Sequence, residues 1–335
     1  MRASRTKVVI ISPALRGANN GNWRTAQRWS RFLRPRFDAE IRAEFRTRSP
    51  PSVMIALHAR RSAGALESFA NAHPERPRIL VLTGTDLYRD IGIADDASAR
   101  HSLEVATHLV VLQEAALDVL DSRHRRKCRV IYQSAPPLES GVARRRTFDV
   151  VIVGHMRAEK DPLTPMRALE RLPVDSRVRV IHIGEALSED YARAASALQN
   201  RAWPLVQRYR WLGGRPHGET RRRIRDAEAM LISSVIEGGA NVIAEAVTCG
   251  VPVIASRIDG NVGMLGRDYA GYFTPGDDRE LAQLLERLPR DAAHRAQLRN
   301  QCETRAALFD PSREEAEVNR LVDDALGLEA SRGGG

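Results

Sequence analysis

Short apolar runs recur along the chain and alternate with stretches in helical rhythm. In the first half the runs are Val8–Ile11, Val53–Leu57, Ile79–Leu82, Leu109–Leu112 and Val130–Tyr132. In the second half they are Val150–Val153, Val180–Ile183, Tyr209–Leu212, Ala229–Ile232 and Val251–Ala255. Short apolar runs without alternation are typical of parallel strands buried on both faces of a sheet. The pattern therefore predicts two α/β blocks, each with its own parallel sheet.

The boundary between the blocks falls in the segment 136–147, PPLESGVARRRT, which has the composition of a linker. A chain of 335 residues suits two domains of ordinary size. We expect a Rossmann-like domain over residues 1–140, joined by a C-terminal helix over 312–328, and a second over 148–305. The predicted fold class is α/β, with two doubly wound domains facing each other across a cleft, where such sheets bind ligands.

Bulk composition limits the classes of function. The chain is 43% hydrophobic and 28% charged, which is typical of a soluble globular protein. It has no apolar run of membrane-spanning length and no signal-peptide pattern, so we expect a cytoplasmic protein with no membrane partner. The three cysteines are odd in number and lack metal-ligand spacing, which argues against a disulfide framework and a zinc site.

The net charge of +10 has two interpretations. Arginine clusters are compatible with nucleic-acid binding, or they are solvated surface. The clusters are scattered, only 5% of residues are aromatic, and no nucleic-acid recognition motif is present. These observations favour the second interpretation and predict no nucleic-acid partner. A positive field also favours anionic small molecules such as nucleotide sugars.

The most informative stretch is EGGANVIAEAVTCG at residues 237–250, in which two glutamates stand eight positions apart. Glycines let a ligand approach the backbone closely, and a helix that begins at Asn241 offers free amides to a diphosphate. Glu237 can then reach polyol hydroxyls, and Glu245 suits a ribose diol. Alternatively, Glu245 only complements the helix dipole. Its apolar neighbours favour the first interpretation, because a buried carboxylate needs a partner.

This stretch, together with VGHMRAEKDPL and RYRWLGG, resembles the donor-binding signature of GT-B glycosyltransferases of the Glu-x7-Glu group, which is similar to glycosyltransferase family 4. The resemblance implies that Glu237 and the following backbone amides hold the donor sugar. It further implies donor contacts from Lys160, Ser234, Gly238, Gly239, Ala240, Asn241, Val242 and Glu245.

The chain departs from the pattern of that group at four places. His155 stands where an arginine is usual, with Arg157 as a possible substitute, and Asp161 stands where a glycine is usual. The usual His-Gly of the first domain reads TGTDLYRD from Thr83. The usual Asn-Gly at the end of that domain reads QSAP from Gln133.

A more specific resemblance covers nearly the whole chain. SPALRGANNGNWRTAQRW, IALHARRS, LTGTDLYRD, VLQE, YQSAPP, GHMRAEKDPL and IDGNVGMLGRDYAGYF together are similar to the selenosugar synthases of selenoneine biosynthesis. The resemblance implies transfer of a hexosyl group from UDP-N-acetylglucosamine or UDP-glucose to selenophosphate. The products would be a selenosugar, passed on to a selenoneine-forming enzyme, together with UDP and phosphate.

The predicted acceptor side begins with Asn20, Gly21 and Asn22, a loop that opens a helix and so can bind an anion. These residues also suit a simple turn and helix cap, although so many asparagines exceed what a turn needs. His58 and Arg60 follow a strand and can bind the phosphoryl group. A satisfied sheet-end histidine is an equal alternative for His58.

Two further loops supply candidates. Thr85 and Asp86 can position the acceptor or the sugar, and Asp86 could equally cap the next helix. Gly260 and Asn261 follow a strand where sugar-facing loops end. His155 and Glu237 complete the candidates for the reaction centre.

No Asp-x-Asp motif is present, so we expect no metal requirement and no cofactor. Selenophosphate is already anionic and needs no strong base. The Glu-x7-Glu group is largely retaining, whereas direct attack by selenium favours inversion. Two alternatives remain: a GT-B glycosyltransferase with a hydroxyl acceptor, and a binding protein without catalysis. The second alternative leaves Glu245 and the asparagine-rich loop without a role.

Overall fold

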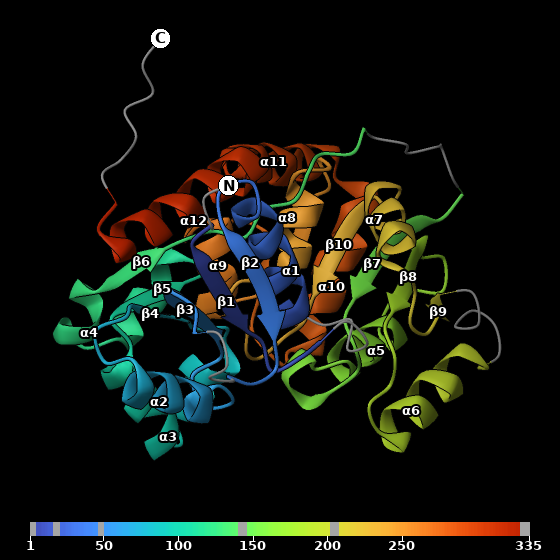
Figure 1. Cartoon of the computed structure of the whole chain (residues 1–335). Helices are drawn as coiled ribbons and strands as arrows, with labels where there is room; N and C mark the ends of the chain where they lie inside the picture. Colours follow the sequence, from blue (N-terminus) through green and yellow to red (C-terminus); the bar gives the residue numbers. More distant parts are fainter. Residues whose placement is uncertain (1–4, 16–20, 46–49, 140–145, 202–207, 329–335) are drawn as a thin grey trace, which may run out of the picture. The chain divides into compact units, whose positions relative to one another are not determined.

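The structure is a computed structural model that describes residues 5–15, 21–45, 50–139, 146–201 and 208–328 (Figure 1). The chain divides into two compact units. Unit 1 comprises residues 1–133, 238–240 and 311–335, and unit 2 comprises 134–237 and 241–310. Each unit is built on its own sheet.

In the described part of unit 1, six parallel strands form one sheet in the order β2-β1-β3-β4-β5-β6. The strands are β1 (Lys7–Ile11), β2 (Asp38–Arg42), β3 (Val53–Leu57), β4 (Arg78–Val81), β5 (His108–Val111) and β6 (Cys128–Val130). The helical segments are α1 (Gly21–Leu33), α2 (Ala63–Ala72), the π-helix η2 (Thr85–Ile91), α3 (Ala97–Val105), the 3₁₀-helix η3 (Glu114–Val119), α4 (Ser122–Arg126) and α12 (Pro311–Leu326).

Alternation along the strands of unit 1 builds two cores, one on each face of the sheet. Val8 and Ile10 of β1 join a cluster with α1 and α12. Val9 and Ile11 point the other way, into a cluster with α2 and α3. Successive side chains of a strand point to opposite faces, so a continuous apolar run is what a sheet covered on both sides requires.

The C-terminal helix α12 packs on α1 through a buried polar contact. Glu314 of α12 is 1% exposed and accepts hydrogen bonds from Arg28 Nε at 2.7 Å and Trp29 Nε1 at 2.8 Å. At the other end of the pair, Arg36 forms a two-pronged ion pair with Asp323. A buried carboxylate destabilises the fold when it loses its partners. The last helix is therefore an integral part of unit 1.

Six parallel strands also form the sheet in the described part of unit 2, in the order β12-β11-β10-β7-β8-β9. They are β7 (Phe148–Val153), β8 (Val178–Ile183), β9 (Tyr209–Trp211), β10 (Ala229–Ile232), β11 (Val253–Ser256) and β12 (Tyr272–Phe273). The helices are η4 (Ala158–Lys160), α5 (Leu163–Glu170), α6 (Glu189–Gln199), α7 (His217–Arg225), α8 (Asn241–Val247), α9 (Asp259–Leu265), α10 (Asp278–Arg290), α11 (Ala292–Glu303) and η6 (Ala306–Phe309).

The fold class expected from the sequence is confirmed, since both sheets are parallel and interleaved with helices. All ten expected strands are present, with ends that match or are shifted by at most two residues. β2 and β12 were not expected. The arrangement of the two units across a cleft stays a prediction. Over the described ranges, no helix is long and apolar enough to cross a membrane.

Candidate functional site

The first glutamate of the donor motif lies in the loop after β10. Its side chain is 11% exposed, and its Oε1 contacts Lys160 Nζ and accepts a hydrogen bond from Ser234 Oγ at 2.6 Å. Glu237, Lys160 and Ser234 therefore meet in unit 2. They do so because β7 and β10 are parallel neighbours, whose carboxyl ends open at one edge of the sheet.

The loop that carries Lys160 is fixed from below. Ser233 Oγ lies 2.9 Å from the carbonyl oxygens of both Lys160 and Asp161. Asp161, which replaces the usual glycine, has a φ of 41° and accepts a hydrogen bond from Thr164 N. The left-handed conformation explains why glycine is usual here, and aspartate is among the residues that tolerate it. A pocket beside this loop is lined in part by Gly154, Lys160 and Ser234.

His155 and Arg157 follow β7 on the same loop. The Nδ1 atom of His155 accepts a hydrogen bond from the backbone N of Glu185 at 3.1 Å. Arg157 is 44% exposed, and its Nε lies 3.8 Å from a carboxylate oxygen of Glu159. The arginine is thus held only loosely, and its guanidinium is available to an anion.

The second glutamate of the motif has a partner that the sequence did not reveal. Glu245 lies in α8 and is 7% exposed, and its Oε1 lies 2.7 Å from His217 Nε2 at the start of α7. Asn241 and Val242 form the beginning of α8 and are half-buried. The apolar surroundings of Glu245 required a polar partner, and His217 supplies it.

Gly260 and Asn261 lie in α9, and Gly260 packs against the loop that carries Glu237. A Cβ on Gly260 would lie 2.0 Å from the carbonyl oxygen of Glu237, so only glycine allows this approach. Asn261 is fully buried and donates to the carbonyl oxygen of Ser256 at 2.9 Å. Its side chain therefore ties α9 to the end of β11.

Beneath the loop after β7 lies the buried His182, an additional histidine of unit 2. Its Nε2 is 3.2 Å from the carbonyl oxygen of Gly154, and its Nδ1 is 3.0 Å from Tyr209 Oη. The carbonyl can only accept, so Nε2 carries the proton and Nδ1 accepts from the tyrosine. Burial lowers the pKa of His182 to about 4, although the hydrogen bond to Gly154 opposes the shift.

In unit 1, His58 occupies the end of β3 in a left-handed conformation, with a φ of 73°. It is 2% exposed, and its Nε2 lies 3.1 Å from Thr85 Oγ1 in the π-helix η2. Burial lowers its pKa, which the charge of Asp86 partly offsets. His58 is thus a non-glycine residue in the left-handed region, and it lies next to a π-helix. Strained backbone of this kind clusters at functional sites.

Asp86 has a different role from His58. It is fully buried and accepts hydrogen bonds from the backbone N of Ala59 and of Thr83, each at 2.8 Å. It thus ties the loop after β3 to the loop after β4. Arg60 is 55% exposed, and its Nε lies 3.2 Å from a carboxylate oxygen of Asp96.

The other candidates are placed as follows. Gly21 and Asn22 begin α1 and are exposed and half-buried, respectively, whereas Asn20 lies outside the described residues. Unit 1 also includes Gly238, Gly239 and Ala240, although the residues before and after them in the sequence belong to unit 2. Among the residues that the structure describes, no three His, Cys, Asp or Glu side chains are grouped so as to hold a metal ion. The absence of a metal requirement stays a prediction.

Comparison with known proteins gives this geometry a context. Residues 140–306 match the family model of glycosyl transferases group 1. This match and the fold support a GT-B glycosyltransferase. The matched segment contains Lys160, Glu237 and Glu245, which all lie in unit 2.

Solved GT-B structures resemble the whole chain. HepE from Anabaena, crystallised in complex with UDP-glucose, superposes with a TM-score of 0.74 at 16% identity, covering 95% of this chain and 99% of HepE. Sucrose-phosphate synthase from Thermosynechococcus elongatus gives a TM-score of 0.77 at 16% identity, covering 96% and 100%. The lipopolysaccharide outer core galactosyltransferase WaaB gives 0.67 at 13% identity, covering 95% and 99%. At such low identity these likenesses show the fold alone.

Proposed function

We propose that this glycosyltransferase moves a hexosyl group from a UDP-sugar to the selenium atom of selenophosphate, as a step of selenoneine biosynthesis. The observation that carries the donor half is the meeting of Glu237, Lys160 and Ser234 beside a pocket that Lys160 and Ser234 help to line. The acceptor half is supported by the resemblance of the unit 1 loops to selenosugar synthases and by the left-handed backbone of His58, whose ring contacts Thr85.

On the donor side, a bound UDP-sugar would replace the contact between Lys160 and Glu237 with contacts to the ligand. Lys160, with Arg157 close by in sequence, would neutralise the diphosphate, and Glu237 would accept hydrogen bonds from sugar hydroxyls. The structural relative HepE was crystallised with UDP-glucose, which supports a donor of this class. Both side chains are partly exposed, so a ligand can exchange with the internal pair.

The chemical step forms a carbon–selenium bond and breaks the bond between the anomeric carbon and the diphosphate oxygen of UDP. Selenium supplies the electron pair, and UDP leaves with the pair from the broken bond. Water then hydrolyses the phosphorus–selenium bond, which releases phosphate and the selenosugar. The nucleophile is already an anion, so the site needs cations that bring two anions together more than it needs a base.

On the acceptor side, a neutral His58 fits this requirement. Its lowered pKa disfavours an imidazolium. Its Nδ1 lies 3.4 Å from the backbone N of Arg61, which leaves the Nε2 proton to donate to Thr85 or to a ligand oxygen. The positive charge for the phosphoryl group would then come from the exposed arginines, Arg60 and Arg61.

A direct assay tests the proposal. The purified protein is incubated with UDP-N-acetylglucosamine or UDP-glucose and selenophosphate, with a chelator in place of metal, and UDP release and product mass are followed. We expect a product of selenosugar mass. The proposal fails if no selenium enters the sugar while an alcohol acceptor supports UDP release, which is the outcome for an ordinary glycosyltransferase. Release of UDP without either acceptor would indicate donor hydrolysis and would equally reject it.

Substitutions test whether Glu237 and Lys160 bind the UDP-sugar. Glu237→Ala and Lys160→Ala should each lower turnover strongly while the protein stays folded. Glu170→Ala serves as the control, because Glu170 lies at the end of α5 and pairs with the exposed Arg201. Wild-type rates in both donor variants would contradict the assignment of these residues. Proton NMR of the product would decide between inversion, which direct attack favours, and retention.

A further inference from the structure

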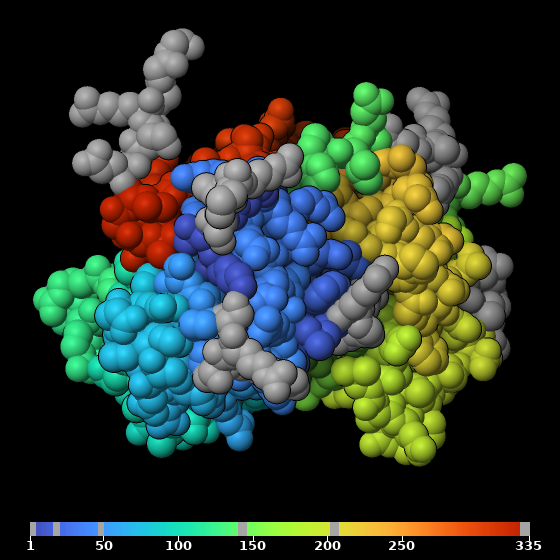
Figure 2. Space-filling view, viewed as in Figure 1, coloured from blue at the N-terminus to red at the C-terminus, as the bar shows by residue number. Residues whose placement is uncertain are grey.

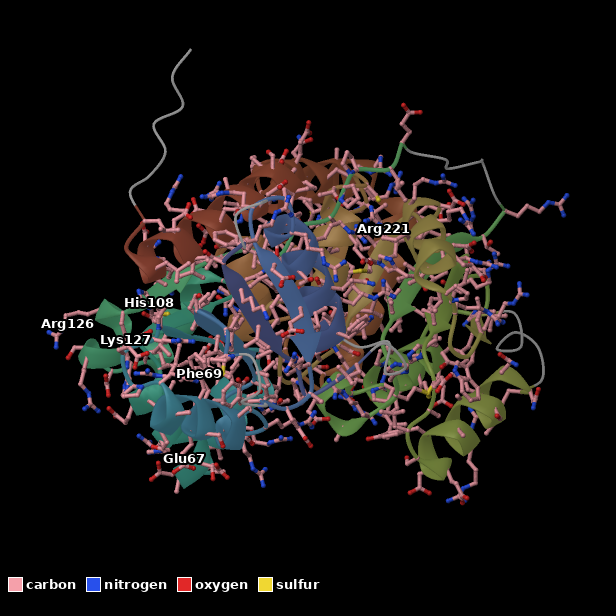
Figure 3. The ribbon with its side chains drawn as sticks, viewed as in Figure 1. Glu67, Phe69, His108, Arg126, Lys127 and Arg221 are labelled. Carbon is pink, nitrogen blue, oxygen red and sulfur yellow. The ribbon has the colours of Figure 1, made fainter. Side chains whose placement is uncertain are left out.

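Two polar contacts join α7 to α8 at the same spacing. His217 at the start of α7 meets Glu245 in α8, and Arg221 meets Cys249 just beyond α8. Arg221 follows His217 by four residues, and Cys249 follows Glu245 by four residues, which is about one turn of a helix. The two helices therefore share one polar seam. α7 lies on the surface of unit 2 in Figure 2, and Figure 3 labels Arg221 on it.

The first contact involves the glutamate that the proposed function assigns to the ribose. His217 Nε2 lies 2.7 Å from Oε1 of Glu245. A carboxylate only accepts, so the ring donates its N–H. Within the described part of the chain, Oε2 of Glu245 forms no hydrogen bond. The side chain is 10% exposed, so one oxygen is held by the histidine while the carboxylate stays within reach of a ligand.

The histidine is itself placed by a constrained turn. Between β9 and α7 the chain passes Gly213, which has a φ of 67°, and Pro216, which precedes the first residue of the helix. The carbonyl oxygen of Pro216 accepts hydrogen bonds from the backbone N of Thr220 at 3.0 Å and from its hydroxyl at 3.2 Å. The start of α7 is thus fixed, and His217 with it.

The second contact fixes the register of the two helices. Arg221 is 6% exposed, and its Nη2 lies 3.6 Å from Cys249 Sγ and donates to the carbonyl oxygen of Pro136. A buried guanidinium held in this way resists sliding of α7 along α8. The register therefore keeps His217 opposite Glu245.

We infer that His217 is a positioning residue for ribose recognition: it orients the carboxylate of Glu245 so that this group selects a nucleotide with ribose hydroxyls. The inference rests on the proposed function, because that assigns Glu245 to the ribose of a UDP-sugar. Without the histidine, the carboxylate loses the donor that fixes its rotamer, and its fit to the diol weakens. His217 contacts Glu245, and it acts on the ligand through that contact.

Binding of two nucleotides tests the inference. UDP and 2′,3′-dideoxy-UDP are titrated by calorimetry into the wild-type protein and into His217→Leu, His217→Gln and Arg223→Ala. Leucine removes the donor at similar bulk, and glutamine retains an N–H at a similar reach. Arg223 lies on the same helix, 40% exposed, and serves as the control.

We expect the wild type to bind UDP about tenfold or more tightly than the dideoxy nucleotide, because a hydrogen bond to a charged group contributes a factor of that size to affinity. His217→Leu should weaken UDP binding by about tenfold and leave dideoxy-UDP binding unchanged. His217→Gln should retain most of the preference, and Arg223→Ala all of it. Thermal unfolding of each variant shows that the proteins are folded.

Three results would overturn the inference in distinguishable ways. Equal weakening of both nucleotides by His217→Leu would mean that the histidine only packs the helices. A full preference for UDP in both His217 variants would mean that Glu245 needs no positioning. If the wild-type protein binds neither nucleotide or does not distinguish them, the donor assignment of the proposed function fails, and the inference fails with it.

Discussion

Two carboxylates, one in each unit, follow the ends of parallel strands, and they differ in burial and in what binds them. Asp86 in unit 1 accepts backbone hydrogen bonds from Ala59 and Thr83. Glu237 in unit 2 is held by the side chains of Lys160 and Ser234. Backbone amides cannot leave without reshaping the loop, whereas a lysine and a serine can turn to a ligand. We therefore expect Asp86 to be a structural carboxylate and Glu237 a ligand-binding one.

The largest expected effect tests the functional side of this comparison. Glu237→Gln should lower turnover by about a hundredfold, because the neutral amide loses charge where the sugar is held. The amide can still bond Ser234, so the melting temperature should change little. Steady-state rates and thermal unfolding measure the two quantities. An intact rate with a lowered melting temperature would place Glu237 with Asp86 as a structural group.

Asp86→Asn tests the structural side. The amide group of asparagine would face a backbone N–H that now has an acceptor, so we expect a loss of about 3 kcal/mol in the free energy of unfolding. Urea denaturation measures this loss. Asp96→Asn is the control, because Asp96 caps α3 near the surface and should cost about 1 kcal/mol. Unchanged stability together with lost activity would show that Asp86 acts in catalysis.

A third prediction concerns the pH dependence of stability in unit 2. The pKa of His182 is lowered by burial from 6.5 to about 4, so the unfolded chain binds a proton more readily than the folded one. Stability from this group is complete above pH 6.5 and is lost as the pH falls from there toward 4, by about 2 kcal/mol at pH 5. His182→Gln should flatten this part of the profile. Denaturation at several pH values measures it, and an unchanged slope in the variant would contradict the assignment.

The smallest expected effect concerns the support of the donor loop. Gly260→Ala places a Cβ against the carbonyl of Glu237, so the loop must shift, at a cost of about 1–2 kcal/mol. Turnover should fall by about tenfold, because the glutamate moves with its backbone. Gly64→Ala is the control: an added Cβ there meets open space in α2, and stability should be equal or slightly higher. Equal activity in both variants would show that the loop tolerates displacement.

The apolar pattern predicted the sheets because most strands are buried on both faces, as β3 shows at every position. It missed β2 (Asp38–Arg42), a sheet edge in which only Ala39 is buried. It also missed β12, which has only two residues. An edge strand pairs on one side only, so its sequence need not be apolar. Fold class was therefore readable from the sequence, whereas one edge strand of each sheet was not; the opposite edges, β6 and β9, were expected.

Within the candidate site, sequence motifs indicated which loops carry the candidate residues but not which contacts each residue makes. Glu237 and Lys160 belong to one motif each, and the structure brings them together because their strands are neighbours. Asn261 belongs to a motif as well, yet its buried side chain bonds the end of β11. His217 carries no motif. Its contact depends on the packing of α7 against α8, which local sequence does not encode.

The joining of α12 to α1 has a consequence for how this chain is made. Glu314 completes the core of a unit whose sheet is already finished at residue 130, with all of unit 2 synthesised in between. During translation, the first sheet therefore emerges well before its last helix, while Arg28 and Trp29 lack their acceptor. All residues of unit 2 are therefore synthesised before α12, the last helix of unit 1. Unit 1 therefore becomes complete only after α12 has been synthesised.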